Sequence, residues 1–239
     1  MDKFTFRSNI MPAAETGYTL LIPPFDVVVR ENTLTLTATA PAADEDRLEE
    51  QAEEVAHDLA RSLSYEHSER FEVTFVSYRI LHPNGLLSVV SHLRKIAKPA
   101  LISAPSTVDQ ATLQRRSDRA RRAGRNADLR DMLDHWARYA ADPEGRLHPL
   151  YDVLQVAERL YAAPREPRKK RHQKIASALG MSSADLDALG DLTNNPTVLN
   201  GRHPGAAPGP HRIATDAEVA TCERVARAII ENYAAKIVV

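Results

Sequence analysis

Cysteine is almost absent from this chain of 239 residues, in which Cys222 is the only one. A disulfide framework within the chain and a zinc site built from several cysteines are therefore excluded. The chain also has no apolar run that approaches the roughly 20 residues of a membrane-spanning helix. Its N-terminus lacks a basic segment followed by an apolar stretch, so we expect no signal peptide, no membrane partner and a soluble, cytoplasmic protein.

Motifs that announce a cofactor or a reaction are also missing. The sequence contains no glycine-rich phosphate loop, no Gly-x-Ser-x-Gly turn and no His-x-x-x-His pair of metal ligands. We therefore expect no cofactor and no metal site. Cys222 falls on the apolar stripe of the last predicted helix, where a cysteine usually packs as a small hydrophobic residue.

The charge of the chain is divided unequally. Hydrophobic residues make up 43% of the sequence, enough to bury a core, and the net charge is only −1. Residues 1–100 hold 10 Lys and Arg against 15 Asp and Glu, a net charge of −5. Residues 101–239 hold 21 against 17, a net charge of +4. The two halves are expected to do different jobs, and the second half permits contact with RNA.

The first 95 residues have the pattern of strands around one helix. Segments that alternate apolar and polar residues, or are rich in β-branched ones, occupy residues 4–7, 18–22, 25–29, 33–37 and 71–77. Between them, apolar residues recur at helical spacing from Leu48 to Leu63, and the other faces are acidic. This pattern predicts a β-β-β-α-β module.

The rest of the chain predicts a connector and helices. Six arginines lie within residues 115–125, and residues 96–125 are expected to be a basic connector that can be helical in part. Beyond it, apolar residues cover most of the circumference of a helix that begins near Pro149, which is typical of a central helix. The expected fold class is α+β: an N-terminal β-sheet module with one covering helix (1–95), then a C-terminal all-α helical bundle (126–239).

Three stretches of the C-terminal half carry a family resemblance. They are the helix 150–158 with its Tyr and Glu, the run 175–195 with Gly180 at a turn, and the loop 199–203 before a long terminal helix. In helix order and in this short polar loop, residues 126–237 resemble the HEPN helical-bundle domains of prokaryotes.

The resemblance implies a set of functions. Many HEPN domains are metal-independent ribonucleases of toxin–antitoxin, CRISPR or antiviral defence systems, and others bind RNA or form a dimer scaffold. Catalytic members carry an Arg and a His that are separated by a short spacer near the start of the last helix. In this sequence Arg202 and His203 are adjacent. Two spaced pairs lie elsewhere, Arg130 with His135 and Arg165 with His172.

The loop 194–203 is the best candidate for a catalytic site. Arg202 can stabilise charge that develops on a phosphate, and His203 can exchange a proton near neutral pH. Asn194 and Asn195 can orient these two side chains. In the alternative interpretation the asparagines cap the preceding helix and Arg202 pairs with an acid.

Two basic patches are candidate binding surfaces for phosphates. One comprises Arg115, Arg116 and Arg119. The other comprises Arg168, Lys169, Lys170 and Arg171. No aromatic residue lies between the basic ones, so base stacking is not indicated. Alternatively, the patches are solvated helix faces, or they contact the acidic N-terminal helix.

Two hypotheses from different classes follow. The first is an RNA-associated HEPN-like protein, with metal-independent endoribonuclease activity through Arg202 and His203 and a homodimer formed by the helical bundle. The second is a non-catalytic interaction protein whose helical module dimerises or docks a protein partner while its sheet senses or binds.

Overall fold

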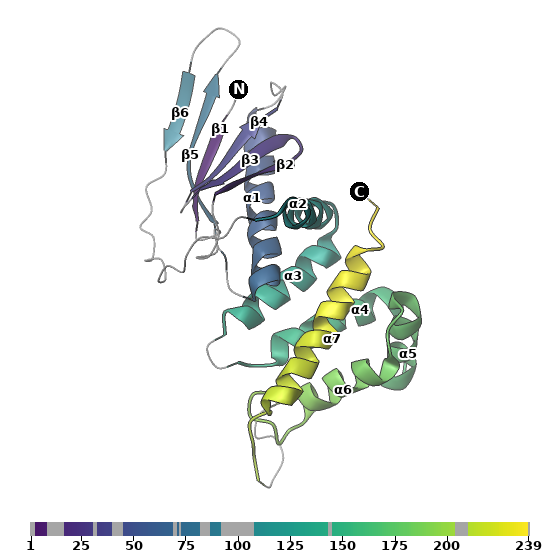
Figure 1. Cartoon of the computed structure of the whole chain (residues 1–239). Helices are drawn as coiled ribbons and strands as arrows, with labels where there is room; N and C mark the ends of the chain where they lie inside the picture. Colours follow the sequence, from purple (N-terminus) through teal and green to yellow (C-terminus); the bar gives the residue numbers. More distant parts are fainter. Residues whose placement is uncertain are drawn as a thin grey trace. The chain divides into compact units, whose positions relative to one another are not determined.

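The computed structural model describes residues 3–8, 17–30, 33–39, 45–68, 71, 73–81, 87–91, 108–142, 145–203 and 210–238. The chain divides into two compact units (Figure 1). Apart from Ser68, the described residues up to Arg125 form the first unit, and those from Asn126 onward form the second. The fold class is α+β, as expected from the sequence.

The first unit contains an antiparallel sheet. Its described strands are β1 (Lys3–Ser8), β2 (Tyr18–Ile22), β3 (Phe25–Arg30), β4 (Thr33–Ala38), β5 (Val73–Leu81) and β6 (Leu87–Ser91). They lie in the order β2-β3-β4-β1-β5-β6, and each pairs antiparallel with its neighbours. Four strands therefore precede the first helix and two follow it. The β-β-β-α-β pattern contains three before the helix and one after it.

One face of strands β2 to β4 is buried, because apolar residues alternate with polar ones along each strand. In β4, Leu34, Leu36 and Ala38 are buried and the intervening threonines are partly exposed, as their alternation predicted. Helix α1 (Glu45–His67) packs against β1 and β5 through a stripe that includes Ala52 and Leu59. The sheet and this stripe form the core of the unit.

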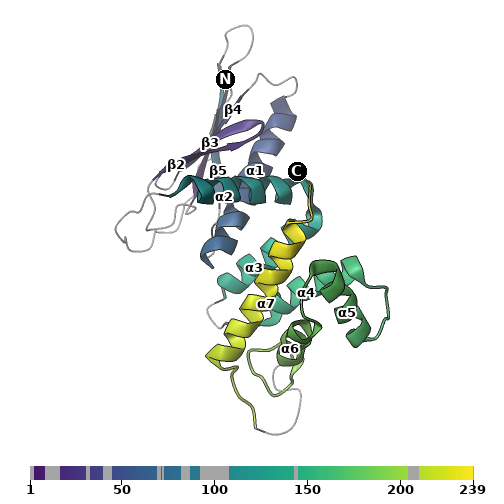
Figure 2. The same ribbon diagram turned by 45° about the vertical axis from the view of Figure 1, so that its right-hand side comes forward.

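Part of the segment predicted to be a basic connector forms a second helix of the first unit. Residues within 96–107 lie outside the described part, but α2 (Gln110–Arg125) is a helix of 16 residues. It packs against α1 and against β2, where the hydroxyl of Ser117 donates a hydrogen bond to the carbonyl of Leu21 at 2.6 Å (Figure 2). Two helices, and not one, therefore pack on this sheet.

The second unit is helical in its described part. Its helices are α3 (Ala127–Ala140), α4 (His148–Tyr161), α5 (Arg168–Leu179), α6 (Ser183–Asn194) and α7 (Asp216–Ala234). Helix α4 packs against α3, α5, α6 and α7, which confirms its central place. Its buried residues lie on most sides of the helix, as the sequence indicated. Among the described residues, no helix is both long and apolar enough to cross a membrane.

Local signals in the sequence set the ends of these helices. The side chain of Asn126 accepts a hydrogen bond from the N–H of Leu129 and caps α3. Thr215 and Glu218 form the predicted capping box at the start of α7. Gly180 ends α5 with a φ of 67°, a left-handed conformation in which glycine carries no steric penalty.

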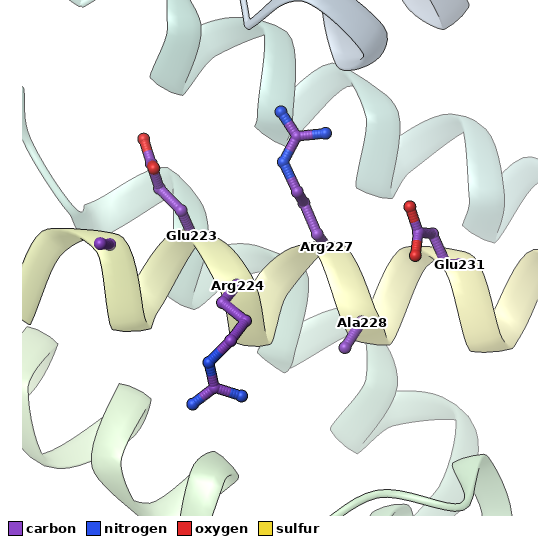
Figure 3. A pocket seen from close by; sticks show the side chains of 6 residues that line it. Glu223, Arg224, Arg227, Ala228 and Glu231 are labelled. Carbon is purple, nitrogen blue, oxygen red and sulfur yellow. The ribbon is translucent and has the colours of Figure 1, made fainter.

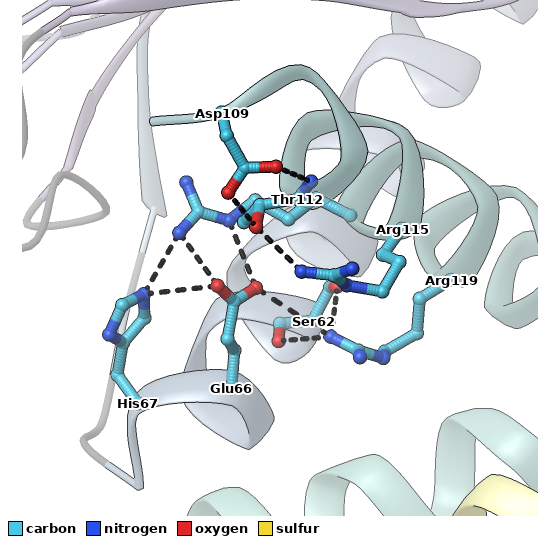
Figure 4. Close-up of polar contacts among 8 residues, drawn as sticks. Ser62, Glu66, His67, Asp109, Thr112, Arg115 and Arg119 are labelled. Atoms are coloured by element: carbon cyan, nitrogen blue, oxygen red, sulfur yellow. Dashed lines mark hydrogen bonds and ion pairs between the residues drawn. The ribbon is translucent and has the colours of Figure 1, made fainter. Parts of the chain in front are cut away.

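An ion pair joins the two helices of the first unit. The guanidinium of Arg116 on α2 is 0% exposed and donates from Nε and Nη2 to the carboxylate of Glu66 on α1, at 2.9 and 2.8 Å (Figure 4). Arg119 lies 3.9 Å from the same carboxylate. Burial raises the pKa of Glu66, but the hydrogen bond and charge of Arg116, with His67 and Arg119, outweigh it and hold the pKa below its usual value.

The Glu66→Gln substitution is expected to destabilise the first unit. It leaves the buried Arg116 without a counter-charge, which costs roughly 3 kcal/mol. Native-state hydrogen exchange of the amides in α1 measures this loss. Arg115→Ala is the matched control, because Arg115 is exposed and donates to the hydroxyl of Thr112 on its own helix. An equal loss in both variants would show that the pair with Glu66 has no special role.

The pH dependence of this stabilisation has a definite sign. The pKa of Glu66 is lower in the folded protein than its ordinary value of 4.5, so the contribution is complete above that value. It is lost as the pH falls through the folded pKa. The difference in α1 protection between the wild type and Glu66→Gln is therefore expected to shrink below about pH 4. A difference that stays constant down to acid denaturation would contradict this.

Candidate functional site

The loop that follows α6 is held by its own backbone and by asparagine side chains. The N–H of Leu199 donates to the carbonyl of Arg212 at 2.8 Å, which ties the loop to the segment before α7. Asn200 accepts from the N–H of Ala214 at 3.0 Å, and its carbonyl accepts from the N–H of Leu147 at 2.7 Å. These hydrogen bonds fix the backbone of the loop, so its last residues lie near the start of α4.

Arg202 is fixed in this loop by an aromatic side chain. Its backbone N–H donates to the carbonyl of Thr193 at 2.6 Å. Its guanidinium carbon lies 4.9 Å from the ring centroid of Tyr151, a buried residue of α4. Such stacking is a cation–π contact that leaves the edge of the guanidinium open. Within the described part of the chain, the side chain of Arg202 makes no ion pair or hydrogen bond.

His203 is exposed and adjoins Arg202 in the sequence. Among the described residues, no hydrogen bond or ion pair joins its ring to Arg202 or to a carboxylate. The two side chains predicted to be catalytic thus share one end of the helical unit, but no direct contact between them is formed. The alternative interpretation, in which Arg202 pairs with an acid, finds no such acid in the described part.

Asn194 and Asn195 shape the loop. The amide of Asn194 donates to the carbonyl of Gly190 at 2.8 Å. The Oδ1 of Asn195 accepts from the backbone N–H and the hydroxyl of Thr197, at 3.0 and 2.9 Å. These hydrogen bonds stabilise the end of α6 and the turn after it. These contacts agree with the interpretation in which the asparagines stabilise the end of the helix, and the role of orienting Arg202 and His203 stays a prediction.

The basic segment at the start of α5 is largely neutralised within the helical unit. Arg168 pairs with Asp191 at 2.7 Å, and Arg171 lies 3.2 Å from Glu158. Lys170 lies 3.6 Å from Glu166. Of the four residues predicted to bind phosphates here, only Lys169 is exposed with no ion pair among the described residues. Phosphate binding by this segment would therefore have to compete with these ion pairs.

The patch predicted at Arg115, Arg116 and Arg119 is also engaged within the protein. Arg116 is buried against Glu66, and Arg119 donates to the hydroxyl of Ser62 at 3.2 Å. Arg115 is exposed. In Figure 4, Arg119 points toward the carboxylate of Glu66, and Arg115 points toward Thr112. The expected contact with the acidic N-terminal helix is therefore the one that the structure contains, and Arg116 is inaccessible to a nucleic acid.

The spaced pair Arg165 and His172 does not form a site. His172 is 1% exposed, and its ring lies 2.6 Å from Asp187 and 3.3 Å from Glu158. Burial raises the pKa of Glu158, but the hydrogen bond from His172 and the charge of Arg171 lower it below its usual value. The imidazole is thus held between two carboxylates and cannot reach a substrate.

In the other spaced pair, Arg130 with His135, the histidine already contacts other side chains. His135 lies 3.4 Å from Asp152 on α4 and contacts Arg138. Burial and the charge of Arg138 lower the pKa of His135, against the opposing effect of Asp152. This histidine, a residue of α3 that faces Asp152 of α4, is therefore biased toward its neutral form.

A shallow pocket on α7 has charged walls that already have partners (Figure 3). Arg227 stacks on the ring of Trp136 at 4.4 Å, and Arg224 pairs with Asp185 at 3.0 Å. The carboxylate of Glu223 accepts from the hydroxyl of Tyr139 at 2.8 Å. These contacts stabilise the bundle, so we do not assign a ligand to this pocket.

Cys222 is buried, as its place on the apolar stripe of α7 predicted. Burial, with the charges of Glu218 and Glu223, raises the pKa of its thiol to about 12. The thiol is therefore not a nucleophile near neutral pH. In the described part of the chain, no group of three or more His, Cys, Asp and Glu side chains is placed to hold a metal ion.

Two residues of the site could be only partly predicted from the sequence. Tyr151 and Glu158 lie in the helix that carries the HEPN resemblance, and both are polar residues within an apolar pattern. That pattern was the available signal for the aromatic face under Arg202 and for the acid beside His172.

No family model matches the sequence, and neither a curated protein nor a solved structure gives a match.

Removal of the aromatic face is expected to release Arg202. Tyr151→Phe keeps the ring and should leave the side chain held, whereas Tyr151→Leu removes the cation–π contact, which contributes about 0.5–1 kcal/mol. The NMR order parameter of the Arg202 Nε–H is expected to fall in the Leu variant alone. Arg146, an exposed arginine of the same unit, is the internal reference. Equal order in both variants would show that Tyr151 does not hold Arg202.

Proposed function

We propose that the helical unit binds RNA by holding a phosphate against Arg202. The observation that carries this proposal is the guanidinium stacked on Tyr151, whose N–H donors have no protein partner among the described residues. A guanidinium already fixed in one orientation loses little entropy when it binds an anion bidentately. The exposed Lys169 belongs to the same unit and adds a positive charge. The exposed His203 adds a group that can exchange protons.

The reaction that we propose for this site is metal-independent cleavage of RNA. His203 takes the proton of a ribose 2′-hydroxyl, and the 2′-oxygen forms a bond to the adjacent phosphorus. The bond from phosphorus to the 5′-oxygen breaks, that oxygen receives a proton, and a 2′,3′-cyclic phosphate remains. Arg202 stabilises the negative charge that grows on the phosphate oxygens. The resemblance to HEPN domains supports this chemistry and suggests a cytoplasmic defence or toxin–antitoxin setting.

Binding through a single dominant guanidinium leads to a measurable salt dependence. Each phosphate contact on single-stranded RNA contributes about 0.7 to the slope of log affinity against log salt. Arg202→Ala is therefore expected to weaken binding of an RNA oligonucleotide and to reduce this slope by about 0.7. Lys236→Ala removes one exposed positive charge at the end of the last helix and serves as the control. Identical slopes in the two variants would refute the role of Arg202.

Cleavage is tested by incubation of total RNA with the full chain in the absence of metal ions. Loss of the proton acceptor in His203→Ala is expected to reduce the rate by about 100-fold or more. His211→Ala, which changes another exposed histidine, should keep the wild-type rate. Cleavage that is equal in all three proteins, or absent from all three, would remove the nuclease proposal and leave the binding proposal to the salt experiment.

A second function is favoured by one apolar feature. Leu199 is 46% exposed and Ile213 is 67% exposed, and a hydrogen bond ties the backbone of Leu199 to the residue before Ile213. Beside them lies a groove of about 460 Å³ between α6 and α7. Exposed apolar side chains next to a groove are typical of docking surfaces. We therefore keep the alternative of a non-catalytic module that dimerises or docks a protein here.

Sedimentation velocity separates this alternative from the first. If the helical unit forms a homodimer through this surface, Ile213→Asp is expected to shift the equilibrium to monomer by placing a charge in the interface. Val238→Asp, which changes an exposed residue near the chain end, is the control. An unchanged oligomeric state in Ile213→Asp would exclude self-association through this surface.

A further inference from the structure

The cleavage reaction proposed above moves two protons. His203 takes one from the 2′-hydroxyl, and the oxygen that leaves the phosphorus receives the other. The attacking and leaving oxygens lie roughly in line on opposite sides of the phosphorus, so one imidazole does not reach both. A second side chain that can exchange a proton is therefore needed near Arg202.

His148 is a histidine of the helical unit that lies beside the loop with Arg202. It is the first residue of α4, and its side chain is 48% exposed, so a substrate can reach the ring. Histidine exchanges protons near neutral pH, which is the chemistry that the leaving oxygen requires. Its place in the fold therefore decides whether it can serve the proposed site.

Two contacts of the loop flank His148 along α4. The N–H of the preceding residue, Leu147, donates to the carbonyl of Asn200 at 2.7 Å. Tyr151, three residues after His148, carries the guanidinium of Arg202 on its ring, at 4.9 Å from the ring centroid. Residues three apart on a helix are neighbours on its surface, with Cβ atoms about 5–6 Å apart. His148 thus lies between the backbone contact and the aromatic contact of one loop.

The carboxylate of Asp152 orients the imidazole of His148. The Nε2 of His148 lies 3.3 Å from the Oδ1 of Asp152, which is one turn further along α4. This contact directs the ring along the helix toward the turn that carries Tyr151. The Nδ1 of His148 has no hydrogen bond or ion pair among the described residues. One ring nitrogen therefore positions the imidazole, and the other is left for a substrate.

Asp152 is itself held in place from α3. Its side chain is 12% exposed, and its Oδ2 lies 3.4 Å from the Nδ1 of His135. Burial and the charge of Arg138 lower the pKa of His135, so this histidine is biased toward its neutral form. A neutral imidazole does not cancel the charge of the carboxylate. The negative charge of Asp152 therefore remains available to His148.

On the basis of the proposed function, we propose that His148 is the proton donor of the cleavage reaction and that Asp152 is its positioning residue. As the bond from phosphorus to the 5′-oxygen breaks, the electron pair of that bond takes the proton from the Nδ1 of His148. The reaction leaves His148 neutral and His203 protonated. Exchange of protons with water restores both side chains for the next turnover.

The test replaces the leaving oxygen by sulfur. The substrate is a single-stranded RNA oligonucleotide that spans a site at which the full chain cleaves total RNA. It is made with either oxygen or sulfur in the bridging 5′ position of that site. A thiol has a pKa near 8.5, so a thiolate leaves without a proton donor. His148→Ala is therefore expected to cleave the oxygen substrate about 100-fold more slowly, and the sulfur substrate at nearly the wild-type rate.

Three further variants assign the roles. His203→Ala removes the proton acceptor and is expected to be slow on both substrates. Asp152→Asn is expected to lose rate on the oxygen substrate alone, because the imidazole of His148 is no longer held by a charge. A purely structural role of Asp152 would lower both rates equally. His211→Ala changes another exposed histidine of the same unit and should keep both wild-type rates.

The outcomes separate this proposal from the one on which it rests. Absence of cleavage by the wild-type chain removes the nuclease proposal, and the role of His148 with it. Wild-type cleavage together with an unchanged rate in His148→Ala overturns the role of His148 alone. An equal loss on both substrates in His148→Ala also overturns it, since the sulfur substrate needs no proton donor.

Discussion

A guanidinium that leaves water must find a counter-charge or an aromatic face, and this constraint organises both units. In the first unit it joins α2 to α1 through Arg116 and Glu66. In the second, Arg168 and Arg171 fold back on the carboxylates of Asp191 and Glu158. Several arginines in the described part of the basic second half therefore hold helices together instead of standing free in solvent.

Arg202 meets this constraint in a different way from Arg116, Arg168 and Arg171. It is half-buried, yet its partner is the ring of Tyr151 and not a carboxylate. An aromatic face stabilises a cation without using its N–H donors, so the guanidinium is positioned and still able to bind an anion. The proposed function rests on this difference between paired and stacked arginines.

Local sequence patterns predicted the helices and strands. Contacts between side chains that are far apart in the sequence could not be predicted in this way. Alternation in residues 33–37 and the Thr215–Glu218 box are local, and the structure contains the buried strand and the capped helix that they indicate. The run of arginines in 115–125 indicated a connector, since nothing local reveals that Arg116 meets a carboxylate 50 residues earlier. For the candidate site, the sequence indicated the loop and Arg202. It left open whether the asparagines orient Arg202 and His203 or bond to the backbone, because both roles suit the same local pattern.

The proposed function depends most on whether Arg202 binds the RNA. The direct measurement is the chemical shift of its Nε–H in the ¹⁵N-labelled full chain as a single-stranded RNA oligonucleotide is added. The account predicts a saturable shift of the Arg202 signal, while the signal of Arg138, whose guanidinium contacts His135, stays in place. An Arg202 signal that does not move while RNA binds, or an RNA that does not bind at all, would contradict it.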